Sequence, residues 1–198
     1  MLAESSLTSG RGFLATEPPT DRVSGSLRIG CLATIRGTMP SVPLTHLTDV
    51  GSGSGLALCA LAGWTTDGQC CIPILTGVDI SLQCVRSFNT TMNRLTSSTE
   101  TPPFTRCYHG DIEECTALPG SDGVFVFAAG MAAKTKRHII RLCKQGDVRW
   151  LCFVDWAQNI SRDGWTAVFS KVYQRGSGAQ YTAFVSTDLG AITQNSIR

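Results

Sequence analysis

Short apolar runs in which hydrophobic residues alternate with polar ones recur along this chain of 198 residues. In the segment 26–35 one side would carry Leu27, Ile29, Cys31, Ala33 and Ile35. A period of two is the pattern of a β-strand with one buried face. The segment 79–88 repeats it, and 148–156 is apolar on both sides, as a strand covered on both faces is. The sequence therefore predicts strands in preference to helices.

Turn-forming residues separate these runs. The chain has 20 glycines, and turn sequences stand at 66–68, 121–123, 162–164 and 175–178. Further strands or apolar runs are expected at 55–63, 69–75, 123–130, 165–173 and 180–187. Only 89–98 and 130–144 are expected to form short helices. Eight or nine strands at this spacing predict an all-β fold, either a sandwich or a barrel.

The length favours one domain. Residues 1–24 alternate poorly and are expected to form an extended N-terminal arm in front of a domain at 25–198. Two segments, 38–55 and 97–123, are expected to be surface loops, and the second is long enough to carry function.

Charge and cysteine content exclude several classes of protein. The formal net charge is +2 and 16% of residues are charged, which excludes a disordered chain and a polybasic nucleic-acid binder. No apolar run approaches the roughly 18 residues of a membrane span, and the first residues predict no signal peptide. The nine cysteines are odd in number and mostly lie within apolar runs, which indicates a reduced chain from a cytosolic context.

One concentration of basic residues lies at 132–144. The cluster contains Lys134, Lys136, Arg137, Arg141 and Lys144. Such a cluster can neutralise phosphates, so these five are predicted as nucleic-acid contacts. A solvated helix or loop face is the alternative, because aromatic residues for base stacking are missing between them.

Other reactive residues give weaker signals. Cys107, His109 and Cys115 stand close together, but their spacing does not fit a zinc site or an activated thiol. The Gly-Ser run at 51–55 would need a Lys-Ser/Thr pair and a following helix to cradle a phosphate. Neither is expected there, so a flexible loop is predicted. The sequence predicts no catalytic residue, no metal and no cofactor.

An all-β hydrolase is an alternative that the sequence leaves open. It would combine His46 and Asp79 with a nucleophile such as Cys107 or Cys143. Neither cysteine stands in a glycine-rich turn that could form an oxyanion hole, which weighs against this class.

Several segments together resemble the strand order of picornavirus-like coat proteins. They are 25–37 as a first strand, 77–91 in the middle, and 123–141, 148–165 and 178–192 as the later strands and their loops. The resemblance implies an eight-stranded jelly-roll β-sandwich with short helices in loops. It also implies a capsid protein, such as the small coat protein of a plant secovirus.

The function that this resemblance implies is structural and not enzymatic. The subunit would assemble with copies of itself and related subunits into an icosahedral virion of a positive-strand RNA virus. It would lie in the virion, and in the host cytoplasm during assembly, with genomic RNA as a partner on the inner face and no membrane partner. Low charge suits a subunit whose sides neighbours bury. The alternative is a β-sandwich module that binds a receptor or glycan through the 38–55 or 97–123 loop.

Overall fold

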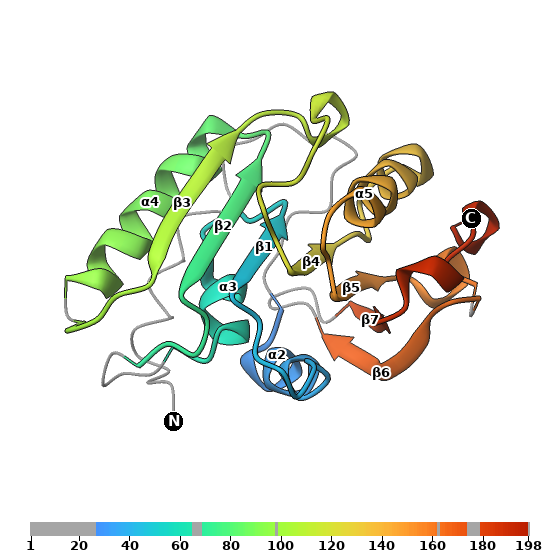
Figure 1. Cartoon of the computed structure of the whole chain (residues 1–198), viewed down its shortest axis with the longest axis horizontal. Coiled ribbons are helices and arrows are strands. Elements are labelled where there is room, and N and C mark those ends of the chain that lie inside the picture. Colours follow the sequence, from blue (N-terminus) through green and yellow to red (C-terminus); the bar gives the residue numbers. More distant parts are fainter. Residues whose placement is uncertain (1–26, 65–68, 98, 162, 174–178, 198) are drawn as a thin grey trace.

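A seven-stranded mixed sheet forms the centre of the molecule (Figure 1). The computed structural model describes residues 27–64, 69–97, 99–161, 163–173 and 179–197. The strands are β1 (His46–Val50), β2 (Ile74–Asp79), β3 (Phe104–His109), β4 (Gly123–Phe127), β5 (Trp150–Asp155), β6 (Thr166–Tyr173) and β7 (Gln180–Ser186). Their order across the sheet is β3-β2-β1-β4-β5-β7-β6. The first five strands in this order, β3, β2, β1, β4 and β5, run parallel to one another. β7 runs antiparallel to both its neighbours, β5 and β6.

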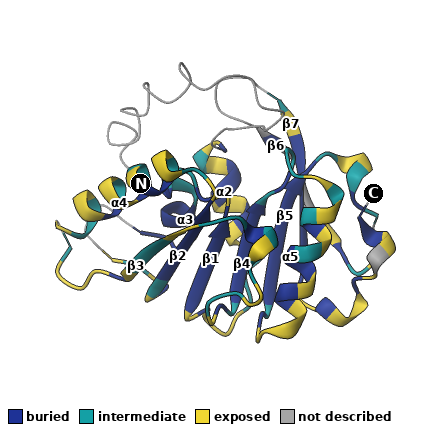
Figure 2. Ribbon diagram, turned by 90° about the horizontal axis from the view of Figure 1, so that it is seen from above, coloured by how far each residue is buried: buried dark blue, intermediate teal, exposed yellow. Residues whose placement is uncertain are grey.

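Helices cover both faces of the sheet, because parallel strands need long crossover connections. The helices are α2 (Ile29–Arg36), α3 (Leu56–Leu61), α4 (Leu82–Thr96) and α5 (Ala133–Gln145). Short 3-10 turns are η2 (Ile112–Glu114), η3 (Ala157–Asn159), η4 (Leu189–Ala191) and η5 (Gln194–Ser196). Figure 2 shows α2, α3 and α4 on one face and α5 on the other.

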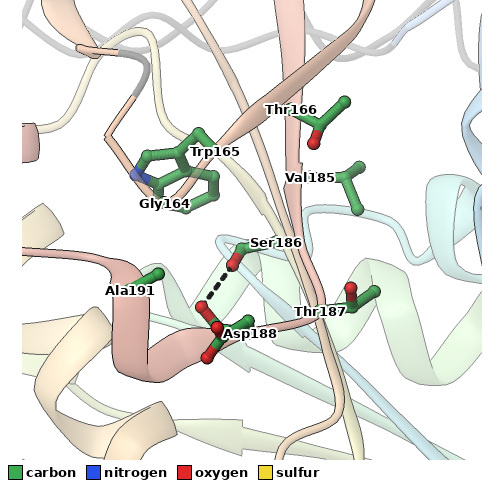
Figure 3. Close-up of a pocket in the computed structure, with 8 residues that line it drawn as sticks. All are labelled: Gly164, Trp165, Thr166, Val185, Ser186, Thr187, Asp188 and Ala191. Atoms are coloured by element: carbon green, nitrogen blue, oxygen red, sulfur yellow. Dashed lines mark hydrogen bonds between the residues drawn. The ribbon is translucent and has the colours of Figure 1, made fainter.

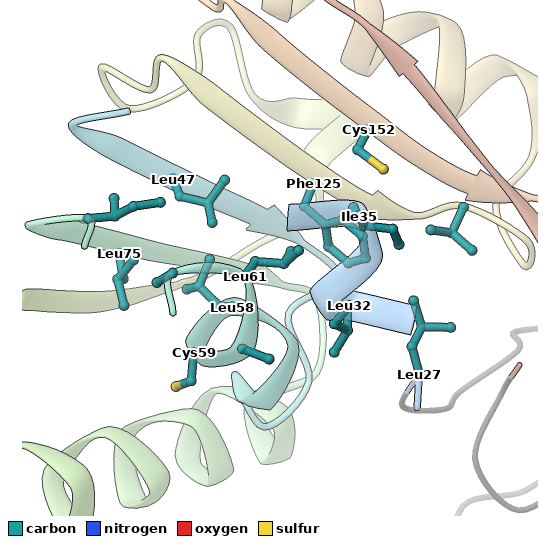
Figure 4. Packing of buried hydrophobic residues seen from close by; sticks show 14 of the residues in the cluster. Leu27, Leu32, Ile35, Leu47, Leu58, Cys59, Leu61, Leu75, Phe125 and Cys152 are labelled. Atoms are coloured by element: carbon teal, nitrogen blue, oxygen red, sulfur yellow. The ribbon is translucent and has the colours of Figure 1, made fainter. Parts of the chain in front are cut away.

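Two hydrophobic cores follow from this layering. The core under α2, α3 and α4 contains Ile35, Leu61 and Phe125 (Figure 4). The core under α5 contains Val126 and Ile139. Alternate residues of a central strand enter opposite cores, so such a strand must be apolar throughout.

The predicted all-β jelly roll is wrong, because two expected strands are helices. The segment 26–35 contains most of α2, and 79–88 contains the first half of α4. In α4 the buried residues are Val85, Phe88 and Met92, spaced three and four apart, which is the helical period. Leu82, which the two-residue period would place on the same side as Ile80 and Phe88, is exposed. Over only ten residues, a few apolar positions fit both the two-residue period of a strand and the 3.6-residue period of a helix.

The expected loops are also partly wrong. The segment 38–55 contains β1, whose five residues are all buried, and 97–123 contains β3 and η2. The apolar run 55–63 contains α3. Strands at 123–127, 150–155, 166–173 and 180–186, and the helix α5, are confirmed. The predicted N-terminal arm, residues 1–24, lies outside the described residues.

Two further properties hold for the described part of the chain. None of its helices combines the length and apolarity needed to cross a membrane. The nine cysteines, which all lie in the described ranges, form no disulfide bond.

Candidate functional site

The loop between β1 and α3 is an ordered turn at the carboxyl edge of the parallel strands. Gly51, Gly53 and Gly55 have φ angles of 81°, 54° and 79°, a left-handed region that glycine enters without steric cost. The Gly51 N–H donates to the Val78 carbonyl over 2.8 Å, which ties the turn to β2. The prediction of a flexible loop without a following helix is therefore wrong.

The three loop glycines have different surroundings. A Cβ on Gly55 would lie 2.5 Å from Met92 Cε and 2.7 Å from the Phe88 ring. A Cβ on Gly53 would meet nothing within 4 Å. The turn is thus pressed against α4 at Gly55 and open at Gly53, where a ligand can approach the backbone.

Two carboxylates flank the turn. Asp79, the last residue of β2, accepts hydrogen bonds from the N–H groups of Gly53 and Ser81, each over 2.9 Å. Asp49, near the end of β1, is 2% exposed. Its burial, and then the negative charge of Asp79, raise the pKa of Asp49 to about 8.

No basic residue balances these acids along the chain. The sequence has no lysine or arginine between Arg36 and Arg86, a stretch that contains β1, the glycine turn, α3 and β2. We call the turn 51–55 with Asp49 and Asp79 the acidic cradle. Its charge favours a neutral or cationic ligand over a pyrophosphate.

The topology points to the same place. In the sheet, β1 lies between β2 and β4. The chain continues from β1 to β2 and β3 on one side, and then crosses to β4 on the other side of β1. In open α/β sheets, ligands bind at the carboxyl ends of the strands at such a switch point. The acidic cradle is therefore the candidate ligand site.

Aromatic side chains continue this edge beyond β1. Phe127 ends β4, one position past the residue that pairs with Val50. Its ring centroid lies 5.0 Å from that of Tyr181 on β7, and the Trp156 ring lies 4.5 Å from Tyr181. The half-buried Phe127 and Trp156 rings form an apolar wall beside the cradle.

A buried ion pair supports this wall from the α5 side. Lys136 Nζ donates to Asp155 Oδ2, and the two side chains are 2% and 0% exposed. The other carboxylate oxygen of Asp155 accepts from the Trp156 N–H over 2.7 Å and from Asn159 Nδ2 over 3.0 Å. One carboxylate therefore joins α5 to the segment after β5.

The five basic residues predicted as nucleic-acid contacts all lie on α5. Besides the buried Lys136, the contacts are Lys134 with Glu113 at 2.7 Å, Arg137 with the Ile197 carbonyl at 3.3 Å, Arg141 with His138 at 2.6 Å and Lys144 with the Ile192 carbonyl at 2.5 Å. The Lys134 contact attaches η2 to α5, the Arg137 and Lys144 contacts attach the C-terminal segment, and the Arg141 contact lies within α5. A nucleic-acid role for the exposed members stays a prediction.

The residues of the alternative hydrolase do not come together. His46 begins β1 and pairs with Ile74, whereas Asp79 lies five residues further along β2, about 16 Å away. Burial raises the pKa of Cys107 to about 11 and that of Cys143 to about 12, so neither thiol is activated. Within the described residues no group of three or more histidines, cysteines or carboxylates is arranged to hold a metal ion.

A groove of about 280 Å³ lies at the opposite edge of the sheet, between β6, β7 and η4 (Figure 3). Ser186 pairs with Leu151 at the start of β5, far from the acidic cradle. The one carboxylate in the groove, Asp188, accepts from the Gly190 N–H over 3.1 Å, and the Ser186 hydroxyl donates to the Asp188 carbonyl. Because Asp188 and Ser186 are engaged in these hydrogen bonds, the groove offers less acid–base chemistry than the cradle.

Comparison with known proteins identifies the fold. The chain is similar to the 23S rRNA methyltransferase ErmE, with a TM-score of 0.57, 14% identity, and coverage of 80% of this chain and 67% of that one. The methyltransferase domain of bacterial CtHen1-CN gives a TM-score of 0.56 at 13% identity, covering 81% of this chain and 100% of that one. Magnesium protoporphyrin IX methyltransferase (ChlM) from Synechocystis PCC 6803, solved with bound SAM, gives 0.51 at 14% identity, covering 80% and 77%.

The extent of these matches varies. The chain spans about half the length of some other matched structures, such as the YcgJ protein from Bacillus subtilis at 51%. No protein-family model and no curated protein sequence matches the chain. The fold is thus the mixed, Rossmann-like sheet of S-adenosylmethionine (SAM)-dependent methyltransferases.

These findings correct the coat-protein interpretation. The resemblance to picornavirus-like capsid proteins is wrong, since the described residues form a mixed α/β sheet and no jelly roll, and the fold is shared with the three methyltransferase structures named above. The predictions of a non-enzymatic virion subunit, and of a β-sandwich binding module as its alternative, depended on that fold and are wrong with it.

The sequence contained a signal for the cradle. Asp49, Gly51, Gly53 and Gly55 stand at every second position, and Asp79 ends the next strand. The spacing departs from the dinucleotide pattern G-x-G-x-x-G and lacks the lysine of the phosphate loop, so neither pattern predicts the cradle.

Proposed function

We propose that this chain is a SAM-dependent methyltransferase that binds its cofactor in the acidic cradle. The acidic cradle, at the switch point of the sheet and without a lysine or arginine on β1, α3 or β2, carries this proposal. The likeness of the fold to methyltransferases, one of them solved with bound SAM, supports it.

The residues of the cradle fit the nucleoside part of this cofactor. Each oxygen of Asp79 accepts one backbone N–H, and a carboxylate oxygen can accept a second hydrogen bond. Asp79 can therefore accept from the two ribose hydroxyls, as the acidic residue of dinucleotide sites does from one. The open side of Gly53 lets the ligand come close to the backbone.

The charge of the acidic cradle fits the part of the cofactor that carries the positively charged sulfur. When bound, SAM supplies a methyl group on a positively charged sulfur, and an acceptor lone pair displaces the neutral thioether as the carbon–sulfur bond breaks. Asp79 contributes negative charge, and a bound cation would favour the ionised form of Asp49 against its raised pKa. Both effects stabilise a cation and disfavour the pyrophosphate of a dinucleotide. The cradle thus distinguishes SAM from other nucleotide-bearing cofactors.

The segment after β4 limits how the acceptor can lose its proton. Residues 128–131 are Ala-Ala-Gly-Met and contain no ionisable side chain. Acceptors that lose a proton easily after methylation therefore suit this site best. The wall of Phe127 and Trp156 would contact the apolar part of such an acceptor.

Isothermal titration calorimetry with S-adenosylhomocysteine, the product of methyl transfer, tests the cofactor assignment. We expect binding to the wild-type chain and at least ten-fold weaker binding to Asp79→Asn, because the uncharged amide accepts fewer hydrogen bonds. Asp147→Asn, at an exposed position, is the matched control and should bind like wild type. Failure of both SAM and S-adenosylhomocysteine to bind, or tighter binding of NAD⁺ or ATP, would overturn the proposal.

Transfer itself needs a second measurement. The chain is incubated with methyl-tritiated SAM and, separately, with total RNA, denatured protein and a small-molecule extract. Label that enters one fraction with wild type, and not with Asp79→Asn, supports the proposal and identifies the acceptor class. No transfer to any fraction by a chain that binds SAM would contradict it.

A further inference from the structure

The edge strand β3 exposes a stripe of side chains that the proposed site does not use. Phe104 is 60% exposed and Tyr108 is 43% exposed, with Arg106 between them. Alternate strand residues point to the same side. The Arg106 Cζ atom lies 5.8 Å from the Phe104 ring centroid and 5.0 Å from that of Tyr108. We call these three residues the aromatic stripe.

The aromatic stripe lies on a bare part of the sheet. Cys107, the next residue on β3, packs into the core under α4, so the stripe faces the other side, the side of α5. Figure 2 shows α5 beside β4 and β5, away from β3. Among the described elements no helix covers β3 on this side. Large exposed aromatic side chains on such a face mark an interaction surface.

The guanidinium of Arg106 is held in place but not neutralised. Arg106 Nε donates to Thr76 Oγ1 over 3.4 Å, and the same hydroxyl bonds His46 Nε2 over 2.7 Å. No salt bridge of Arg106 is found within the described residues. A positive charge between two exposed rings is thus available to an anionic partner.

We propose that the aromatic stripe binds single-stranded nucleic acid, with bases stacked on Phe104 and Tyr108 and a phosphate at Arg106. Exposed aromatic residues on an open sheet are a known way of binding unpaired bases, and stacking does not depend on sequence. The two ring centroids lie 5.8 and 5.0 Å from the Arg106 Cζ atom, so they are no further apart than the sum of these distances, and one short single strand can reach both rings. An arginine fork suits phosphate, whereas an apolar protein partner would bury the unpaired charge at a cost.

The aromatic stripe also leads toward the proposed cofactor site. His109, the residue after Tyr108, pairs with Asp79 of the acidic cradle. A strand bound along β3 would therefore pass the carboxyl edge of the sheet. The proposal does not depend on methyl transfer, because binding to the stripe needs no cofactor.

Fluorescence anisotropy with a fluorescein-labelled twelve-residue oligouridylate tests this surface in the wild-type chain without cofactor. Phe104→Ala/Tyr108→Ala should weaken binding at least ten-fold, since each stacked base contributes strongly. Phe104→Leu/Tyr108→Leu keeps the apolar bulk and should weaken it similarly. Arg106→Gln should weaken binding and reduce its salt dependence.

Arg86→Gln is the charge-matched control, because Arg86 is exposed on α4 at the opposite face of the sheet. It should bind like wild type, and circular dichroism should show all variants folded. Absence of oligouridylate binding by wild type, unchanged binding by the double alanine variant, or full binding by the leucine variant would each overturn the proposal. A dimer in sedimentation velocity that dissociates in the double alanine variant, without RNA binding, would assign the stripe to a second copy instead.

Discussion

Replacing Gly53 or Gly55 by alanine should separate ligand binding from folding within one turn. Both glycines have positive φ, at 54° and 79°, where an added Cβ costs about 1–2 kcal/mol. At Gly53 nothing lies within 4 Å of that Cβ, so this backbone cost is the whole effect on stability. Its new methyl group would occupy the open side of the turn, where we place the cofactor.

Gly55→Ala adds a clash in the core. The new Cβ would stand 2.5 Å from Met92 Cε and 2.7 Å from the Phe88 ring, and both side chains are almost fully buried. Such overpacking costs about 1–3 kcal/mol more, which gives a total of about 2–5 kcal/mol.

Thermal denaturation followed by circular dichroism measures the difference. In a chain of this size 1 kcal/mol shifts Tm by about 2–4 °C, so Gly53→Ala should lose about 2–8 °C and Gly55→Ala about 4–20 °C. Gly53→Ala should also bind S-adenosylhomocysteine at least ten-fold more weakly. Equal losses of Tm, or wild-type affinity in Gly53→Ala, would refute the reasoning.

Two further predictions concern buried charges. Lys136→Met leaves the Asp155 carboxylate buried without its partner, and urea denaturation should show a loss of about 3–5 kcal/mol. Lys136→Met/Asp155→Leu should recover most of that loss; a double variant as unstable as the single one would contradict this. The second prediction is that affinity for SAM rises with pH toward about 8, because a bound cation favours the ionised form of Asp49, whose pKa is raised to about 8 in the free chain. Calorimetry between pH 6 and 8.5 should show this rise with wild type and not with Asp49→Asn, and a flat wild-type profile would count against it.

The apolar runs at 123–127 and 150–155 were readable from the sequence as strands. Such a run is buried on both faces, and this property holds wherever the strand lies in a sheet. The sequence also predicts a helix at 130–144, and α5 (Ala133–Gln145) confirms it. The strands predicted in place of α2 and of the first half of α4 are wrong. Their apolar residues are too few to distinguish a period of two from one of 3.6 over ten positions.

The residues that form the acidic cradle are visible in the sequence, with Asp49 before three alternate glycines and Asp79 in the following strand. The local sequence also determines the turn, since only glycine takes three left-handed positions so close together. The tertiary structure alone decided that the two carboxylates meet. Parallel pairing of β1 with β2 brings their carboxyl ends together. Asp49 and Asp79 are thirty residues apart in the sequence, and the sequence does not show that they are neighbours in space. The exposure of the aromatic stripe was likewise decided by the tertiary structure. An alternating strand shows which residues share a face, whereas whether a helix covers that face depends on where the rest of the chain packs.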